Sequence, residues 1–216
     1  MRPTIGDVIP ADSPGPFAGD PAALPGEKAD ILARVSAAVG KGELDRGRQI
    51  LRTEYPFTPI AKTARKYTAR QCLRIFYRDG FLDRYSGLKL VHPGALRALS
   101  VIMPEELPAH PNWAIDQAHF AYWELSPTLD HLMPVARGGA DDETNWMSTS
   151  MLRNSAKAHW TLDELGWTLS PAGDYKKWDG LAGWFVEYLH AHPELVTDKY
   201  LARWFRATVD VRAELP

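Results

Sequence analysis

The sequence predicts an α+β protein that is mostly helical. Apolar residues recur at helical spacing in segments spread along the chain, which is the signature of amphipathic helices. Only two regions, 82–91 and 127–148, carry short runs with the composition of strands. The 216 residues are 45% apolar and 24% charged, a balance typical of a folded globular protein. We therefore expect helices on either side of one small sheet.

The N-terminal part of the chain is expected to begin with a tail and continue as helices. Residues 1–26 are rich in Pro, Gly, Ala and Asp without periodicity, which predicts a disordered tail. The N-terminal helical region that follows, 27–80, contains apolar spacing that predicts helices over 27–39 and 43–53. Its longest helix is predicted over 60–78.

The predicted helix over 60–78 is strongly basic on one face. Residues 43–78 contain nine Lys or Arg against three Asp or Glu. Five of these cations follow one another at intervals of four and so share a face; they are Lys62, Lys66, Arg70, Arg74 and Arg78. Such a stripe neutralises phosphates and releases their counterions, although a solvated helix face is the alternative.

Helices are also expected in the second half of the chain. The spacing predicts them over 94–102, 147–158, 178–191 and 195–208. Thr161 and Glu164 stand at the spacing of a capping box, which would open a further short turn. Residues 161–216 are therefore interpreted as a C-terminal helical region.

The overall composition excludes several classes of protein. A total of 25 Lys and Arg against 27 Asp and Glu excludes a strongly basic nucleic-acid binder, though not a local basic patch. A single cysteine, Cys72, excludes a disulfide framework and a multi-cysteine zinc knuckle. No apolar run is long enough for a membrane span, and the N-terminus lacks the apolar core of a signal peptide. We expect a cytoplasmic protein without a membrane partner.

The densest group of chemically useful residues begins at Asp130 and His131. A carboxylate beside an imidazole offers a hard oxygen ligand and a proton acceptor that titrates near neutral pH. Pro134 has no N–H group and cannot continue a strand ladder, so the pair is expected at a strand end. Taken alone, such a pair is more often a structural hydrogen bond than a catalytic site.

Three further positions downstream extend this group. Asn154 falls on the apolar stripe of the predicted helix over 147–158, where its amide is either a satisfied core group or a ligand for a cation. Arg153 and Lys157 lie on the adjoining face, which suits a phosphate or simply solvent. Asn145 stands at the end of the loop after His131, where its side chain can brace the local backbone.

Together these residues resemble the HNH endonuclease family. The motif reads Asp-His-x-x-Pro, then Gly-Gly, then Asn145, Asn154 and Lys157. Asn145 and Asn154 lie 14 and 23 positions after His131, similar to the HNH domain of RNA-guided CRISPR nucleases. The resemblance implies a ββα-metal core at 81–160, in which a two-stranded hairpin packs on one helix around a divalent cation. N-terminal and C-terminal helices would flank this core.

The resemblance also implies roles for individual residues. His131 would be the general base, and Asp130 and Asn154 would bind the cation, Mg²⁺ or a similar ion such as Mn²⁺. Asn145 would hold the loop of His131, and Lys157 would touch the scissile phosphate or its neighbour. The expected nucleic-acid contacts are Lys62, Lys66, Arg70, Arg74 and Arg153.

The chain departs from the family in one respect. Many members carry two Cys-x-x-Cys pairs that bind a structural zinc, whereas Asp83 and Ser86 stand at the first pair and Ser148 and Met151 near the second. No structural zinc is therefore expected. Apolar packing would hold the hairpin instead, through large side chains that bury much area; the candidates are Trp123, Trp146 and Trp160.

The activity implied by the resemblance is metal-dependent hydrolysis of phosphodiester bonds in DNA. Restriction, phage defence and the processing of mobile-element or phage DNA are settings that the sequence does not separate. The alternatives are an RNase or toxin nuclease with the same core, and a nucleic-acid-binding module that no longer cuts. Cutting of both strands with one active site per chain would favour a homodimer.

Overall fold

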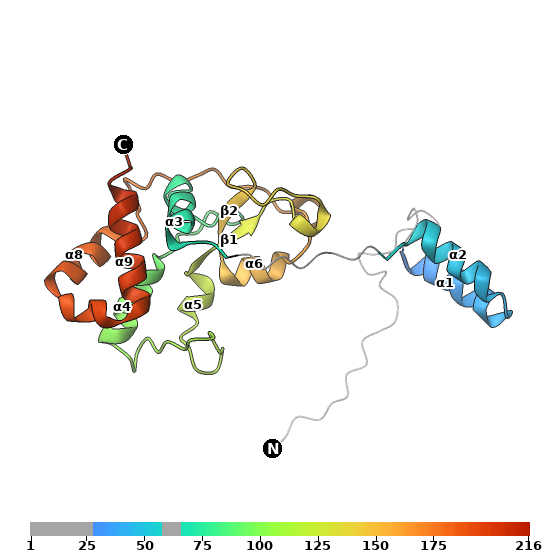
Figure 1. The fold of residues 1–216 in the computed structure, drawn as a ribbon, viewed down its shortest axis with the longest axis horizontal. Coiled ribbons are helices and arrows are strands. Elements are labelled where there is room, and N and C mark those ends of the chain that lie inside the picture. The colour runs from blue at the N-terminus through green and yellow to red at the C-terminus, as the bar shows by residue number, and fades with distance from the viewer. Residues whose placement is uncertain (1–27, 58–65) are drawn as a thin grey trace, which may run out of the picture. The chain divides into compact units, whose positions relative to one another are not determined.

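The computed structural model describes residues 28–57 and 66–216, and the expected tail over 1–26 lies outside them. The chain divides into two compact units, 1–62 and 63–216, which are described separately (Figure 1). The described residues are rich in helix and contain one two-stranded antiparallel sheet, so the predicted α+β class is confirmed. None of their helices is both long and apolar enough to cross a membrane.

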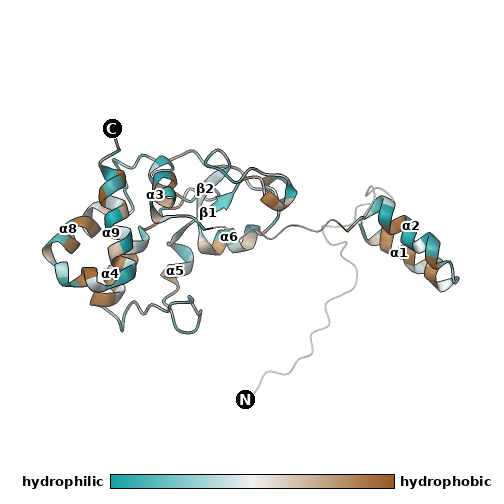
Figure 2. Cartoon of the chain, viewed as in Figure 1, coloured by the Kyte–Doolittle hydropathy of each residue, from teal (hydrophilic) through white to brown (hydrophobic). Residues whose placement is uncertain are grey.

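The first unit is a helical hairpin. Helices α1 (Lys28–Gly40) and α2 (Leu44–Glu54) match the two predicted helices and contact each other along their length. Gly42, which adopts a left-handed φ of 77°, forms the turn between them. Gly47 allows close approach, because a Cβ there would lie 3.3 Å from the side chain of Val39. Figure 2 shows that both helices carry hydrophobic as well as hydrophilic residues.

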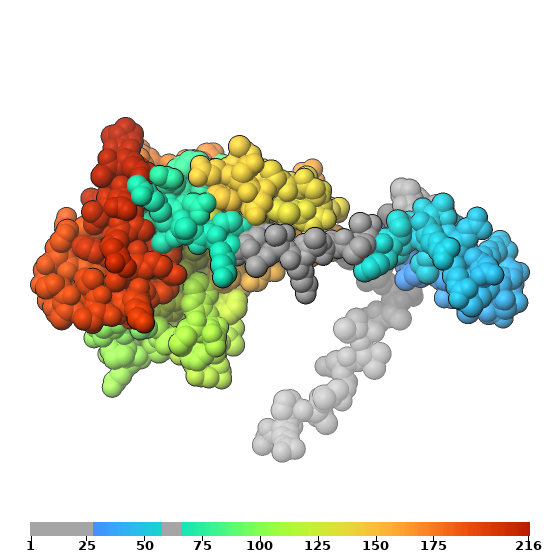
Figure 3. Space-filling view, viewed as in Figure 1, coloured from blue at the N-terminus to red at the C-terminus, as the bar shows by residue number. Residues whose placement is uncertain are grey.

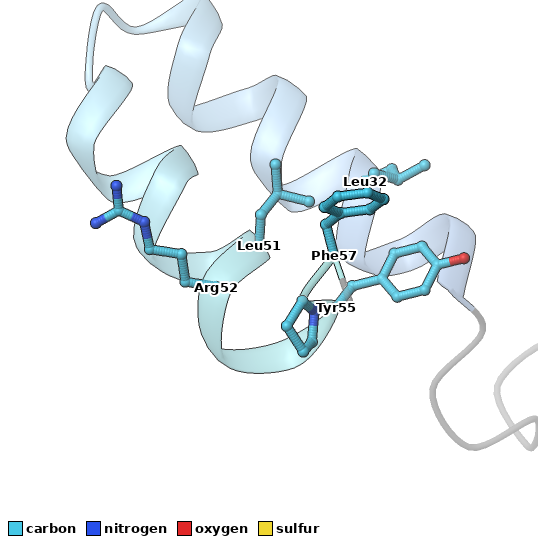
Figure 4. A pocket seen from close by; sticks show the side chains of 6 residues that line it. Leu32, Leu51, Arg52, Tyr55 and Phe57 are labelled. Carbon is cyan, nitrogen blue, oxygen red and sulfur yellow. The ribbon is translucent and has the colours of Figure 1, made fainter. Parts of the chain in front are cut away.

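A cavity of about 680 Å³ opens on this hairpin (Figure 4). Leu32 from α1 and Leu51 from α2 line it, together with Tyr55 and Phe57. Phe57 is 90% exposed. Arg52 is the one ionisable cation of the lining, so the cavity holds no cluster of chemically reactive groups.

The second unit begins with a helix shorter than the sequence predicts. Helix α3 (Ala69–Arg78) starts only after residues 66–68, which are not helical, and residues 60–65 of the predicted helix lie outside the described residues. Thr68 and Gln71 explain this start, because each side chain bonds the backbone N–H of the other. This capping box satisfies the first free amides of α3 and so defines its first turn.

A bundle of helices packs around α9 (Lys199–Arg212). Helix α9 contacts α3, α4 (Pro93–Ile102) and α8 (Ala182–Ala191). In Figure 3, α8 and α9 gather into one continuous block at the end of this unit. The α9 helix begins four residues later than the predicted 195, because Asp198 caps it and residues Pro193–Thr197 form a 3₁₀ helix.

A buried histidine joins α4 to α9. His92 precedes α4, and its Nδ1 accepts hydrogen bonds from the backbone N–H groups of Gly94 and Ala95. Its Nε2 lies 2.9 Å from the Thr208 hydroxyl of α9. Burial lowers the pKa of His92 to about 3, so the ring stays neutral and serves as a cap.

The second unit contains a β-hairpin followed by a helix. Strands β1 (Pro127–His131) and β2 (Trp146–Ser150) pair antiparallel, with His131 opposite Trp146. Helix α6 (Met151–Lys157) follows β2 directly, and the hairpin contacts both α6 and α3. The helix predicted over 147–158 is wrong in its first turn, where the chain is still strand. Every residue of β2 is buried, so the alternation that marks a half-exposed strand is missing.

Buried carboxylates hold the side of β2 that faces away from β1. Asp79 Oδ2 accepts a hydrogen bond of 2.8 Å from the amide of Ser148, and Asp83 Oδ2 accepts one of 3.0 Å from the amide of Ser150. The amide of Arg84 donates to the Ser148 carbonyl. These polar contacts supplement the expected apolar packing, to which Trp146 contributes while Trp160 is 53% exposed.

Short elements complete the second unit. The two β runs expected over 82–91 form only an isolated bridge between Leu82 and Lys89. Helix α5 (Ala121–Glu124) precedes β1, and α7 (Leu162–Leu165) opens with the capping box predicted at Thr161 and Glu164. The boundary between the two units falls inside the predicted N-terminal helical region, 27–80. Helix α3 belongs to the second unit because it packs on the hairpin and on α9.

Candidate functional site

The residues singled out by the sequence meet at the C-terminal end of β1. Asp130 and His131 from β1 and Asn154 from α6 line one cavity of about 310 Å³. Tyr67, Pro134 and His159 also contribute to its walls. The cavity thus combines a carboxylate, an imidazole and an amide from the strand and the helix of the ββα unit.

The carboxylate of Asp130 is buried and paired on one oxygen. Its Oδ2 accepts a hydrogen bond of 2.6 Å from the Tyr85 hydroxyl and lies 2.8 Å from Lys157 Nζ. Burial and the neighbouring Asp130 charge raise the pKa of Tyr85 above its usual value, so Tyr85 remains a donor. The second oxygen, Oδ1, has no hydrogen-bond partner among the described residues, which leaves it as an acceptor for a ligand.

Lys157 holds the site from the interior. Its side chain is fully buried, and its ammonium donates a hydrogen bond of 2.7 Å to the carbonyl of His131 besides pairing with Asp130. The expected contact between Lys157 and a phosphate stays a prediction, and in this structure the ammonium is occupied by Asp130 and the His131 carbonyl. A buried charge requires such pairing, and here it fixes two neighbouring site residues at once.

Asn154 and Asn145 have different surroundings. Asn154 Nδ2 donates to the carbonyl of Leu129 over 3.2 Å, so its amide group is anchored to β1 through the nitrogen. Asn145 braces the loop after β1: Oδ1 accepts from the amide of Met133, and Nδ2 donates to the carbonyls of Met133 and Ala140. The Asn145 side chain thus ties together both ends of the loop, as the sequence suggested.

Gly139 makes this loop possible. A Cβ at Gly139 would lie 1.9 Å from the carbonyl oxygen of Met133 and 2.8 Å from Asn145 Nδ2. No side chain fits at these distances, so the second glycine of the Gly-Gly pair allows the backbone to close against Asn145. Gly138 before it takes a left-handed φ of 91° at the end of the 3₁₀ turn Val135–Arg137.

His131 contacts a carboxylate that the sequence did not single out. His131 is buried, with 9% of its side chain exposed, and its Nε2 lies 2.8 Å from Asp141 Oδ1. The same Asp141 oxygen accepts from the Tyr67 hydroxyl over 2.7 Å and from Trp146 Nε1 over 3.1 Å. Hydrogen bonds from His131 and Tyr67 hold the pKa of Asp141 below its usual value, so this carboxylate is ionised.

Sequence patterns offered no signal for these contacts. Asp141 opens a run of acids in a loop, Asp141 to Glu143, and such runs are usually solvated. Tyr67 lies 64 positions before His131, outside any motif, and Tyr85 lies 45 positions before Asp130. Trp146 was interpreted only as packing, although its indole N–H also takes part in the polar cluster.

The donor set of the cavity suits a hard divalent cation. Among residues 28–57 and 66–216, no group of three or more His, Cys, Asp and Glu gathers as a metal cluster. Asp130 and Asn154 nevertheless offer one carboxylate and one amide oxygen. Mg²⁺ prefers oxygen ligands and keeps several of its waters, so two protein ligands are compatible with it.

The residues expected to contact nucleic acid are largely paired with acids. Lys62 lies outside the described residues, and Lys66 is exposed. Arg70 and Arg74 of α3 both pair with Glu214, which follows α9. These pairs reduce the positive charge that the arginines present to a ligand.

Arg70 has a second acidic neighbour, and two further cations, Arg153 and Arg78, are also paired. Arg70 lies 3.6 Å from Asp210, and Arg153 Nε lies 3.4 Å from the buried Asp83 carboxylate. Arg78, the last cation of the stripe, bonds Asp79 and the carbonyl of Trp146. The stripe therefore serves partly to attach α3 to α9 and to β2.

Comparisons with models of protein families, with curated proteins and with solved structures find no match to this chain. The function of the site must therefore be inferred from the chemistry of its own residues.

Proposed function

We propose that this protein is a metal-dependent endonuclease of the HNH type that hydrolyses phosphodiester bonds in DNA. The observation that carries the proposal is the shared cavity at the end of β1, where Asp130, His131 and Asn154 meet. Asp130 and His131 lie on the first strand and Asn154 on the helix that follows the hairpin, which is the order that the HNH-like motif implies. The loop brace by Asn145 adds support, because it fixes the backbone that follows His131.

The roles of the residues follow from their surroundings. His131 is the proton acceptor, since a positioned neutral imidazole is a common general base that takes a proton from water. Asp130 and Asn154 supply oxygen atoms for the cation, and Lys157 keeps Asp130 in position from the interior. When bound, a divalent cation would polarise the phosphodiester and stabilise the leaving oxygen. The proposal includes no structural zinc.

A plasmid-nicking assay tests the proposal. We expect the purified protein to nick or linearise supercoiled DNA with Mg²⁺ or Mn²⁺ and to stop when EDTA removes the cation. The variant Asn154→Ala should need a higher cation concentration, because it loses one of two protein ligands. Ser155→Ala, on the same helix but outside the lining of the cavity, is the matched control.

The same assay separates the proposal from its alternatives. Cleavage of RNA but not of DNA would instead indicate an RNase. DNA binding without cleavage under any divalent cation would indicate a binding module that no longer cuts. Unimpaired cleavage in EDTA would contradict the role given to Asp130 and Asn154.

The arginines of α3 offer a test of the DNA surface. We propose that Arg70 and Arg74 contact the DNA backbone when they leave Glu214. Glu214→Gln should then tighten DNA binding and steepen its salt dependence, because each phosphate neutralised adds about 0.9 to the slope of log K against log salt. Fluorescence anisotropy over a salt series measures both quantities.

Two comparisons decide this prediction. Arg70→Ala combined with Arg74→Ala should weaken binding and flatten the slope. Glu194→Gln, a change of an exposed acid whose carboxylate pairs with His192, should leave both quantities unchanged. An unaltered slope in Glu214→Gln would mean that the arginines serve only to attach α3 to α9.

A further inference from the structure

We infer that Asp141 is a positioning residue that holds His131 in the tautomer protonated on Nε2, so that Nδ1 is the atom that accepts the proton of the attacking water. This inference rests on the proposed nuclease function for its catalytic meaning. Its structural part concerns only the hydrogen bonds around the His131 ring and can be tested without any cleavage. Asp141 lies in the loop between β1 and β2, ten positions after His131.

Two arrangements of protons compete at Nε2. In the first, Nε2 carries a hydrogen and donates it to Asp141 Oδ1, 2.8 Å away. In the second, Nε2 is unprotonated and accepts the indole N–H of Trp146, whose Nε1 lies 3.2 Å away. A neutral imidazole carries one hydrogen, so only one of these arrangements exists at a time.

Charge and distance favour the first arrangement. A hydrogen bond from an N–H to an ionised carboxylate is roughly twice as strong as one between neutral groups. An unprotonated Nε2 would instead place a lone pair 2.8 Å from the Asp141 oxygen, which is repulsive. The indole of Trp146 loses nothing in this arrangement, because Asp141 Oδ1 accepts its N–H at 3.1 Å.

The Tyr67 hydroxyl also favours the His131 tautomer that is protonated on Nε2. It lies 2.7 Å from Asp141 Oδ1 and 3.4 Å from His131 Nε2, so the carboxylate is the closer acceptor. Asp141 Oδ1 thus accepts the hydrogen bonds that Tyr67 and Trp146 would otherwise donate to His131 Nε2. With Nε2 occupied in this way, Nδ1 keeps its lone pair, and it forms no hydrogen bond to any residue that the structure describes.

Nitrogen NMR of the imidazole ring tests the inference directly. The spectrum is recorded at about pH 8.5, where an ordinary histidine is neutral, and the His131 signals are assigned by their loss in His131→Ala. We expect a protonated Nε2 and an unprotonated Nδ1 in the wild type. Asp141→Ala should shift the ring toward the opposite tautomer, because Trp146 and Tyr67 then donate to Nε2.

Conservative and control variants keep the test decisive. Asp141→Asn retains an oxygen acceptor of the same size and should keep the Nε2–H tautomer. Asp142→Ala removes the neighbouring acid, whose carboxylate bonds Thr144, and should leave the His131 signals in place. An unprotonated Nε2 in the wild type, or an unchanged ring in Asp141→Ala, overturns the inference.

Cleavage rates give a second, independent readout. Loss of a partner that orients a reacting group typically costs about 10- to 100-fold, so Asp141→Ala should lower kcat by that factor with little change in KM. Asp141→Asn should recover much of it. If the tautomer shifts as expected but no form of the protein cuts nucleic acid, the proposed function fails while the role of Asp141 stands. If the wild type cuts DNA but Asp141→Ala alters neither the tautomer nor the rate, the role given to Asp141 fails while the proposed function stands.

Discussion

Replacement of His131 by Ala is expected to lower the rate of DNA cleavage by about 100- to 10,000-fold, the usual contribution of a general base. The variant should still fold, because the buried contacts around Asp130 and Lys157 do not use the imidazole ring. Affinity for DNA should also remain, since the proposed role of His131 is chemical. Single-turnover cleavage, thermal unfolding and anisotropy measure these three properties.

His159→Ala provides the control for this result. His159 lines the same cavity but is exposed. We expect a much smaller effect on the rate from this change. Wild-type cleavage by a folded His131→Ala protein would show that the assigned mechanism is wrong. Equal losses in the two variants would mean that the cavity binds DNA through both histidines without a specific base.

Lys157→Met is expected to have the largest effect on stability. It removes the ammonium that pairs with Asp130 while leaving the Asp130 side chain buried, with 9% of it exposed. Loss of one partner of a buried ion pair typically costs about 3 to 5 kcal/mol. We therefore expect the free energy of unfolding to fall by that amount, measured by urea denaturation.

The double variant Asp130→Asn with Lys157→Met identifies the cause. If the loss comes from the unpaired Asp130 charge, a neutral amide should restore a large part of the stability. The coupling between the two changes should then be on the order of 1 to 3 kcal/mol. Additive losses would indicate that Lys157 stabilises the fold only through its bond to the His131 carbonyl and its packing.

The sequence predicted the elements that have a local signal. The capping box at Thr161 and Glu164 and the helices α1 and α2 depend on neighbours within a few residues, and the structure has them. The strand that ends near Pro134 and the brace by Asn145 also follow from local chemistry. These features need no knowledge of the distant parts of the chain.

The remaining features depend on tertiary contacts. Strand β2 is buried along its whole length, so its sequence does not alternate, and its last residues were assigned to the start of the following helix. Lys157 was expected on a helix face open to phosphate or solvent, whereas its side chain is fully buried, and its contacts with Asp130 and the His131 carbonyl stabilise it there. The Asp141 contact joins two ends of a loop, and residue spacing does not encode such a distance.

The polar contacts along the hairpin also bear on how this protein behaves toward other chains. An open strand edge offers a row of unsatisfied backbone groups on which a foreign strand can assemble, and such edges promote aggregation. Asp79, Asp83 and Arg84 occupy these groups on β2. Asn154 and Lys157 occupy the carbonyls of Leu129 and His131 on β1. These side chains, of which Asn154 also lines the cavity, therefore occupy backbone groups on both strands to which a third strand would otherwise bond.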